Sequence, residues 1–341
     1  MNRYEVGSVG TALASSGRRQ LLAYASATSL SAMLATDAMA QSTRIFSNRP
    51  LRLISGATAG SASDIIARSL ADKLQAEFGV PVIVENRVGA AGAVAVQAVL
   101  SAPPDGHTIF VYTAAHTVVP LITKTSWDPL RDFSAVVPLG VVPNVLVVSP
   151  SKGWKNVRDL VDAAKTRPGA LNYASAGSGS ATHMSAEKFK LATAIDAVHV
   201  PFKGSPEAIT ETIAGRIDYF FAPLVSALPQ LRSGKLQALA VGTTRRSSQL
   251  PDVPTLGESG ISNADYLFWI GMLVSSKTPK EIIAQLNQST LKALDSAEVK
   301  EKLSSLGADP LPMSPEQFDS LIREELATNA QIIRAAGIKV E

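Results

Sequence analysis

Cysteine is absent from the 341 residues of the chain, and this excludes disulfides, thiolate nucleophiles and cysteine-ligated metals. Aromatic residues make up only 6% of the sequence and charged residues only 18%, and no run of Lys or Arg accompanies the net charge of +3. A nucleic-acid partner is therefore not expected, because nucleic acids are bound by clustered basic side chains. The length suggests about two domains of roughly 150 residues each.

A long apolar run is also missing. The stretch after Arg18-Arg19 extends to Ala35, is interrupted by Ser and Thr, and is shorter than the ~20 residues that span a bilayer. Together with Ala38-Met39-Ala40 it has the parts of a secretory signal. We predict that residues 1–40 are removed after Ala40 and that the mature protein is periplasmic and not itself membrane-embedded. The arginine pair fits a twin-arginine signal as well as an ordinary Sec signal.

Apolar runs of strand length alternate with stretches of helical spacing, which is typical of α/β architecture. In the first predicted helix, Ile66, Leu70, Leu74 and Phe78 recur every four residues. The predicted strands are 51–54, 82–84, 108–112, 145–148, 172–174, 198–200, 217–221, 236–241 and 268–274. The later predicted helices are 91–100, 156–164, one ending near 191, 206–214, 279–294, 297–306 and 315–336.

One unit occurs twice in this pattern: a strand, a Gly/Ser-rich loop and a helix, beginning near Leu51 and again near Leu171. Two such halves indicate two lobes with a cleft between them. Ligands of open α/β sheets sit at the carboxyl ends of the strands, where the loops meet helix N-termini. We therefore expect the site to be built from the two repeated loops.

The two loops have the composition of an anion site. Residues 58–64 read Thr-Ala-Gly-Ser-Ala-Ser-Asp, in which Ser61 and Asp64 have the spacing of a capping box. Residues 175–183 read Ser-Ala-Gly-Ser-Gly-Ser-Ala-Thr-His. Both offer backbone N–H groups and hydroxyls at the start of a helix, which favours a negatively charged ligand.

Enzymatic interpretations have less support. Ser178 or Ser180 with His183 suggests an exported serine hydrolase, but neither serine has the glycine spacing of a nucleophile elbow. No dinucleotide or Walker fingerprint occurs, so no cofactor is expected, and the four histidines lack zinc-site spacing. Asp64 and Asp218 are candidates for paired carboxylates across the cleft, although Asp64 also fits a simple helix cap.

An ordered series of motifs extends over roughly residues 50–340: Pro50-Leu51-Arg52-Leu53, Gly60-Ser61-Ala62-Ser63-Asp64 with Ala67-Arg68, Val84-Glu85-Asn86-Arg87-Val88-Gly89-Ala90-Ala91-Gly92, Pro104-Asp105-Gly106-His107-Thr108, Trp127-Asp128-Pro129 with Asp132-Phe133, Tyr173-Ala174-Ser175 through His183, His199-Val200-Pro201-Phe202-Lys203-Gly204, Gly234-Lys235-Leu236, Leu250-Pro251-Asp252-Val253-Pro254-Thr255 and Trp269-Ile270-Gly271. In these motifs the chain resembles the Bug-type solute receptors of tripartite tricarboxylate transporters.

The resemblance implies a two-lobed periplasmic-binding-protein fold of the type II, Venus-flytrap kind. Lobe 1 would comprise residues 48–145 and 270–341, and lobe 2 residues 146–269. It implies that the protein is not an enzyme and captures a small organic carboxylate for the membrane permease subunits of a transporter. A receptor that feeds a sensor kinase is the alternative within the same fold. The sequence departs from the family at Gly56-Ala57, where Pro-Phe is usual, and at Ser61, where the family has glycine.

The expected ligand-binding residues come from both lobes. Those in lobe 1 are Ala57, Thr58, Gly60, Ser61, Ser63, Asp64, Thr113, Ala114 and His116. Those in lobe 2 are Tyr173, Ser178, Ser180, Thr182, His183, Lys203, Gly204 and Asp218.

Overall fold

The computed structural model describes residues 1, 2, 46 and 49–338. Asn48–Glu341 form one compact unit, and Met1–Ser47 form another. Apart from its first two residues, the predicted signal sequence lies outside the described part of the chain. Among the described residues, no helix combines the length and the apolar composition needed to cross a membrane.

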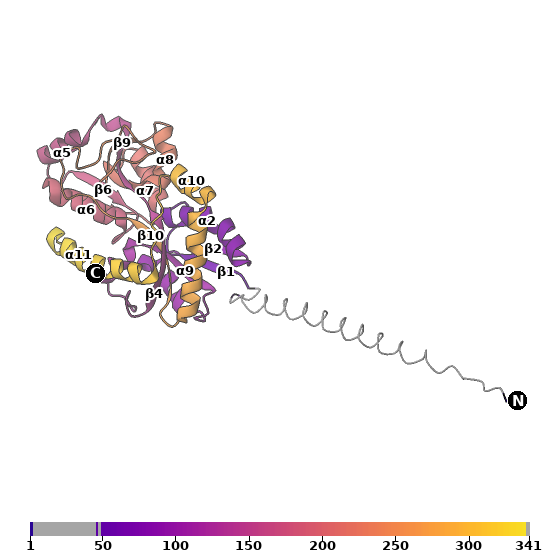
Figure 1. The fold of residues 1–341 in the computed structure, drawn as a ribbon. Coiled ribbons are helices and arrows are strands. Elements are labelled where there is room, and N and C mark those ends of the chain that lie inside the picture. The colour runs from indigo at the N-terminus through magenta and orange to yellow at the C-terminus, as the bar shows by residue number, and fades with distance from the viewer. Residues whose placement is uncertain (3–45, 47–48, 339–341) are drawn as a thin grey trace. The chain divides into compact units, whose positions relative to one another are not determined.

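The strands of the larger unit form two five-stranded sheets (Figure 1). The first has the order β2-β1-β3-β10-β4, and the second β7-β6-β8-β5-β9. The first sheet contains β1 (Leu51–Ser55), β2 (Val82–Asn86), β3 (Thr108–Thr113), β4 (Phe133–Val141) and β10 (Trp269–Ser275). The second contains β5 (Asn144–Val148), β6 (Leu171–Ser175), β7 (Ala197–Pro201), β8 (Tyr219–Pro223) and β9 (Gln237–Val241).

The two sheets repeat one topology. Three neighbouring strands are parallel in each, β2-β1-β3 and β7-β6-β8, and the next strand, β10 or β5, runs antiparallel to them. The chain passes to the second sheet between β4 and β5 and returns between β9 and β10. The repeated unit seen in the sequence is therefore β1 with its loop and helix, and β6 with its loop and helix. The exact lobe boundaries stay a prediction.

Helices cover both sheets (Figure 1). The helices that follow strands of the first sheet are α2 (Ala62–Phe78), α3 (Ala93–Leu100), α4 (Val119–Ile122), α9 (Lys280–Asp295), α10 (Ala297–Ser305) and α11 (Pro315–Ala336). Those of the second are α5 (Val157–Thr166), α6 (Ala181–Thr193), α7 (Ser205–Ile213) and α8 (Leu224–Arg232). The C-terminal helix α11 packs on β4 and also contacts α6, so it joins elements of both sheets.

Burial explains why these segments fold as they do. Ile66, Leu70 and Leu74 of α2 are at most 1% exposed, and the helix ends at Gly79, whose φ of 68° is left-handed. In the second sheet Tyr173, Tyr219 and Phe221 are fully buried in one cluster. Each such side chain contributes roughly 1.5–3 kcal/mol relative to exposure.

The α/β architecture predicted from the sequence is confirmed. Three strands or α-helices were missed: β4, which contains Pro138 and Gly140, the short helix α4, which contains Pro120, and α8, which contains Pro229. Proline and glycine within a run are normally signals of a break. In β4 the pairing with β10 is irregular at these positions, which accommodates the proline.

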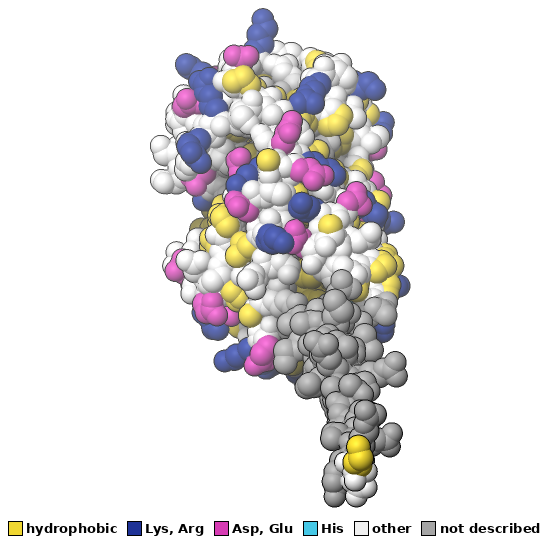
Figure 2. Space-filling model, turned by 45° about the vertical axis from the view of Figure 1, so that its right-hand side comes forward, with side chains coloured by type: hydrophobic (Ala, Val, Ile, Leu, Met, Phe, Trp, Pro, Cys, Tyr) yellow, Lys and Arg dark blue, Asp and Glu magenta, His cyan; other side chains and the backbone are white. Residues whose placement is uncertain are grey.

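On the face shown in Figure 2, Lys and Arg side chains are interspersed with Asp and Glu. This pattern differs from the basic stripe that follows a nucleic-acid backbone.

Candidate functional site

A cavity of about 710 Å³ lies where the carboxyl ends of parallel strands from both sheets meet. Its walls include the loops that follow β1, β6 and β7, together with residues that follow β2, β3 and α4. The volume is within the range of small-molecule binding sites.

The first wall is the loop after β1. Ser55, the last residue of β1, accepts the Ala57 N–H at 3.3 Å and shares a 3.1 Å hydroxyl contact with Ser63. Farther along, Thr58 Oγ1 and Ser61 Oγ are 3.0 Å apart. The predicted capping box is wrong, because Ser61 makes no side-chain cap and its hydroxyl faces Thr58 instead.

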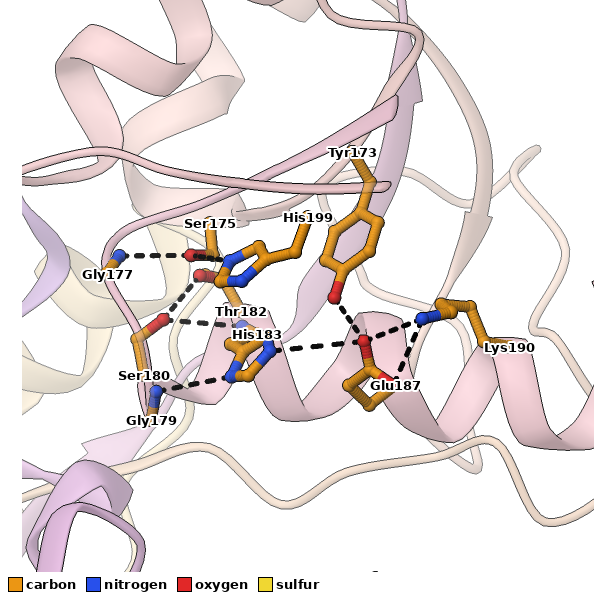
Figure 3. A network of polar contacts seen from close by, with 10 residues as sticks. All are labelled: Tyr173, Ser175, Gly177, Gly179, Ser180, Thr182, His183, Glu187, Lys190 and His199. Atoms are coloured by element: carbon orange, nitrogen blue, oxygen red, sulfur yellow. Dashed lines mark hydrogen bonds and ion pairs between the residues drawn. The ribbon is translucent and has the colours of Figure 1, made fainter. Parts of the chain in front are cut away.

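The second wall is the loop after β6, held by a polar network (Figure 3). Ser175, the last residue of β6, accepts the Gly177 N–H at 3.1 Å and lies 2.6 Å from His199 Nε2. Thr182 Oγ1 accepts the Ala176 N–H at 2.8 Å and lies 2.9 Å from Ser180 Oγ. These hydrogen bonds within the protein therefore hold the loop in place without a ligand.

Asp64 and His183 hold equivalent positions in the two halves. Each is the third residue of its helix, and each accepts an N–H from a loop glycine four residues earlier. Gly60 donates to Asp64 Oδ2 at 3.0 Å, and Gly179 donates to His183 Nδ1 at 3.2 Å. Both side chains are buried and neither lines the cavity. They shape the loops and do not form the cavity wall.

The acceptor role of His183 defines its protonation state. Because Nδ1 accepts a hydrogen bond, it carries no proton, and the ring is neutral with its proton on Nε2. Burial, together with the charge of Lys190, lowers the pKa of His183 to about 4. The stacked ring of His199, 4.0 Å away between centroids, has its pKa lowered to about 3, mainly by burial and then by His183.

Glu187 lies one helical turn after His183 in α6 and is 4% exposed. It accepts hydrogen bonds from the Tyr173 hydroxyl and from Lys190 Nζ, the latter at 3.0 Å (Figure 3). Burial raises the pKa of Tyr173, so its hydroxyl remains a donor. Tyr173 therefore packs in the core next to the loop after β6 and does not line the cavity.

The cavity is electropositive. The first turns of α2, α3, α6 and α7 all contribute lining residues, and the N-terminus of a helix carries roughly half a positive charge. Two of these helices, α2 and α7, have no side-chain cap, so first-turn N–H groups remain available to a ligand, whereas the first N–H of α3, that of Ala93, donates to the Ala90 carbonyl. Lys124 and Lys203 also line the cavity, and none of its described lining residues is acidic.

The loops of the two sheets approach each other closely beside the cavity. Ser226 of α8 donates to the Gly60 carbonyl at 3.1 Å. A Cβ atom on Gly204 would lie 2.0 Å from Thr58 Oγ1 and 3.0 Å from Ser61 Oγ. The walls from the two sheets are thus in direct contact.

The predicted site residues fall into two groups. Those that line the cavity are Ala57, Ser61, Ser63, Thr113, Ser178, Ser180, Thr182, Lys203 and Gly204. Those outside the lining are Thr58, Gly60, Asp64, Ala114, His116, Tyr173, His183 and Asp218. Thr58 and Gly60 lie at the contact between the loops, and Ala114 is buried at the end of β3.

Two of the residues outside the lining have clear partners elsewhere. His116 is fully buried, lies 3.2 Å from the Pro129 carbonyl through Nε2, and has its pKa lowered to about 4 by burial. Asp218 forms a 2.6 Å ion pair with Lys152 and accepts the Asn172 N–H, just before the start of β8. Asp64 and Asp218 do not pair with each other: Asp64, in α2, accepts hydrogen bonds from Gly60 and Arg68, whereas the partners of Asp218 are Lys152 and Asn172.

The serine–histidine contact in this region is not the one considered from the sequence. The ring nitrogens of His183 face Gly179 and Glu187. The Ser180 hydroxyl accepts the backbone N–H of His183 and makes no hydrogen bond to its ring. Ser175 and His199 do pair, but Ser175 is fully buried outside the cavity lining. Within residues 49–338, no cluster of His, Asp and Glu side chains has the composition of a metal site.

Sequence reasoning missed part of the lining. The additional residues are Gly56, Ala62, Val88, Gly89, Ala90, Gly92, Ala93, Tyr112, Ala115, Val119, Thr123, Lys124, Thr125, Ser126, Trp127, Ala176, Gly177, Ala181, Phe202, Ser205, Pro223 and Phe268. Several follow β2 and β7, and the rule that ligands sit at strand carboxyl ends would have found them. Within the segment 123–127 the sequence marked only Trp127, as the first residue of the Trp127-Asp128-Pro129 motif.

Comparisons with known proteins agree on one family. The model for "Tripartite tricarboxylate transporter family receptor" matches residues 66–338. The chain is similar to protein BugT of Bordetella pertussis, at 31% identity over 86% of this chain and 91% of BugT. It is also similar to the solved structure of R. palustris Rpa4515 with adipate, at 31% identity and a TM-score of 0.83, covering 86% of this chain and 99% of that one.

A further solved structure is MatC (Rpa3494) from Rhodopseudomonas palustris with bound malate, at 29% identity and a TM-score of 0.79, covering 84% of this chain and 100% of that one. These likenesses confirm the two-lobed type II, Venus-flytrap fold expected from the sequence. The matching family and the solved neighbours are binding proteins rather than enzymes.

Proposed function

The chain belongs to the tripartite tricarboxylate transporter receptor family, and from this premise we propose that it binds a small organic carboxylate in the cavity between its two sheets. The ligand is held reversibly, without covalent chemistry, in the periplasm. The loaded receptor then delivers it to the membrane permease subunits of a transporter. Two solved neighbours carry adipate and malate, which supports a carboxylate as the ligand class.

One observation carries the proposal. Four helix N-termini and two lysines converge on a cavity with no acidic side chain among its described lining residues. Backbone N–H groups and hydroxyls at helix starts bind carboxylates without needing a full positive charge in contact.

Binding at this place would also favour closure. The ligand would contact the loop after β1 and the loop after β6, which belong to different sheets. A ligand that contacts both stabilises the arrangement in which they meet, by the difference in its affinity for the two arrangements. The permease subunits would recognise that arrangement.

Titration calorimetry on extensively dialysed mature protein tests the proposal. The panel consists of α,ω-dicarboxylates from succinate to suberate, malate, and the monocarboxylates butyrate and hexanoate. We expect at least one carboxylate to bind, and native mass spectrometry of undialysed protein to show a small organic acid. Ser178, which lines the cavity and is exposed, provides the variant: Ser178→Ala should weaken binding about 3- to 10-fold.

Ser233→Ala is the matched control, because this hydroxyl bonds the Gln230 carbonyl at the end of α8 and does not line the cavity. Binding of no carboxylate in the panel, with no organic acid in the mass spectrum, would refute the proposed ligand class.

A further inference from the structure

The loop after β6 uses most of its backbone N–H groups within the protein. Those of Ala176 and Gly177 are accepted by side-chain hydroxyls, and that of Gly179 by His183 Nδ1 at 3.2 Å. Among the N–H groups of residues 176–180, that of Ser178 alone has no partner within the part of the chain that the structure describes. Ser178 is exposed and lines the cavity. The loop therefore leaves one backbone donor for a ligand.

His183 fixes the peptide next to this donor (Figure 3). Gly179 follows Ser178 directly, and its φ of 76° is left-handed, so the chain turns sharply at this point. The His183 ring that accepts the Gly179 N–H is buried, and it stacks on His199 with centroids 4.0 Å apart. Because the packed ring holds Nδ1 in place, it also holds the turn that carries the Ser178 N–H.

The repeated unit shows what the position of His183 must supply. Asp64 is the equivalent residue of α2, and its charge is balanced by Arg68, four residues later, at 2.9 Å. Four residues after His183 the chain has Glu187 instead, with Oε1 lying 3.9 Å from His183 Nε2. An aspartate at 183 would therefore face a like charge, which is unfavourable in a buried place. The second half needs an acceptor that is neutral.

We propose that His183 is a positioning residue: as a neutral acceptor it holds Gly179 so that the Ser178 N–H is aimed at the ligand, while the imidazole itself touches no ligand. This inference rests on the proposed function, because the ligand is the carboxylate bound there. Affinity for a carboxylate then depends on an acceptor atom at this place and not on the imidazole ring.

Two substitutions with the same branching isolate the acceptor. His183→Asn supplies an amide oxygen close to the place of Nδ1, and His183→Leu supplies no polar atom, while both lose the stacking on His199. Calorimetry compares them on succinate to suberate, malate, butyrate and hexanoate. We expect His183→Asn to bind within about threefold of wild type and His183→Leu about 10-fold more weakly, because leucine leaves the Gly179 N–H without an acceptor.

NMR on ¹⁵N-labelled protein gives a second measurement. The Gly179 amide should exchange with solvent slowly in wild type and His183→Asn, and at least about 10-fold faster in His183→Leu. In wild type the His183 ring should carry its proton on Nε2. When a carboxylate binds wild type, the Ser178 amide resonance should shift while the ring nitrogens of His183 stay in place.

The outcomes separate a positioning role from the alternatives. Equal affinity of His183→Leu and wild type would overturn the proposal. A loss in His183→Asn as large as in His183→Leu would also overturn it, in favour of direct contact between imidazole and ligand.

The wild-type spectra do not depend on the folding of a variant. A proton on Nδ1 of His183, or a Ser178 amide that does not respond to a bound carboxylate, would refute the positioning role while the receptor function stands. If wild type binds no carboxylate of the panel, the proposed function fails and this inference fails with it.

Discussion

Gly204 shows how a single residue determines the distance between the two halves of the site. Its φ of 179° is extended and open to any residue, so backbone freedom is not the reason for glycine here. The reason is space, since a Cβ atom would meet Thr58 Oγ1 at 2.0 Å and Thr58 Cβ at 3.2 Å. An alanine would push the loop after β1 away from the loop after β7.

We therefore expect Gly204→Ala to weaken carboxylate binding about 10-fold, which corresponds to ~1.4 kcal/mol. The stability of each sheet should change little, because the added methyl group lies at the contact between the two loops and outside the core of either sheet. Gly257→Ala is the matched control, since its φ is not left-handed and its Cβ would meet only Thr255 Oγ1 at 3.7 Å. Calorimetry and thermal unfolding of both variants would check this, and equal affinities would contradict the steric argument.

At this scale the sequence located the loops but not the direction of their side chains. Asp64 and His183 occur beside glycines and serines that do line the cavity, yet both turn back to hold a glycine N–H. Composition cannot distinguish a side chain that faces a ligand from one that faces its own loop. Trp127 was recognised only within a motif, because its burial depends on His116, eleven positions earlier.

Among the secondary-structure elements, α11 is the one that ties the site to the rest of the first sheet. Its Glu325 accepts hydrogen bonds from Trp269 at the start of β10 and from Thr117, which follows β3, at 2.7 and 3.3 Å. The neighbouring Phe268 lines the cavity. Burial of the carboxyl raises the pKa of Glu325 to about 7, despite the opposing effect of these two donors.

The sign of the pH effect follows from that pKa. The folded protein holds a proton on Glu325 up to about pH 7, whereas the unfolded chain loses it near 4.5. The contribution of this proton to stability is therefore complete below pH 4.5 and is lost as the pH rises to 7. Glu325→Gln should be more stable than wild type at pH 8 by about 1–2 kcal/mol and nearly equal to it at pH 4.5.

Urea unfolding at pH 4.5, 6 and 8 measures this difference. Glu324→Gln, at the adjacent exposed position of α11, should show no such pH-dependent gain. A constant difference between Glu325→Gln and wild type across the three pH values would rule out the raised pKa as its cause.

Elements with a clean apolar period were the predictable ones. The spacing of Ile66, Leu70 and Leu74 predicted α2, and the structure buries all three. The strand β4 was not predicted, because Pro138 and Gly140 interrupt its apolar run. Its pairing depends on β10, more than 120 residues later, and long-range pairing of this kind leaves no local signal.

For the molecule as a whole, the repeated unit was the most informative part of the sequence. A strand, a Gly/Ser loop and a helix at residue 51 and again at 171 predicted two similar halves, and both sheets have the same strand order around β1 and β6. How closely the halves approach could not be predicted, because it depends on contacts such as Ser226 with Gly60, which are 166 positions apart.

The same two-sheet core sets how the molecule responds to acid. Burial lowers the pKa of His116 and His183 to about 4 and that of His199 to about 3, so all three stay neutral in the folded protein. The unfolded chain protonates them near 6.5, so stability falls as the pH drops from 6.5 towards 4. Glu325 acts in the opposite direction between pH 7 and 4.5.

Near pH 5.5, unfolding therefore takes up about three protons at the histidines and releases about one at Glu325. The free energy of unfolding should fall by roughly 2–3 kcal/mol for each unit by which the pH is lowered. Urea unfolding between pH 5 and 6 measures this slope. His199→Gln retains an amide that can meet Ser175 Oγ and should lower the slope by about 1.4 kcal/mol per pH unit, while Glu325→Gln should raise it by about 1. The two variants must move the slope in opposite directions, because one removes a group that is charged only when unfolded at this pH and the other a group that is neutral only when folded. Equal shifts in both would mean that these buried groups do not control the response to acid.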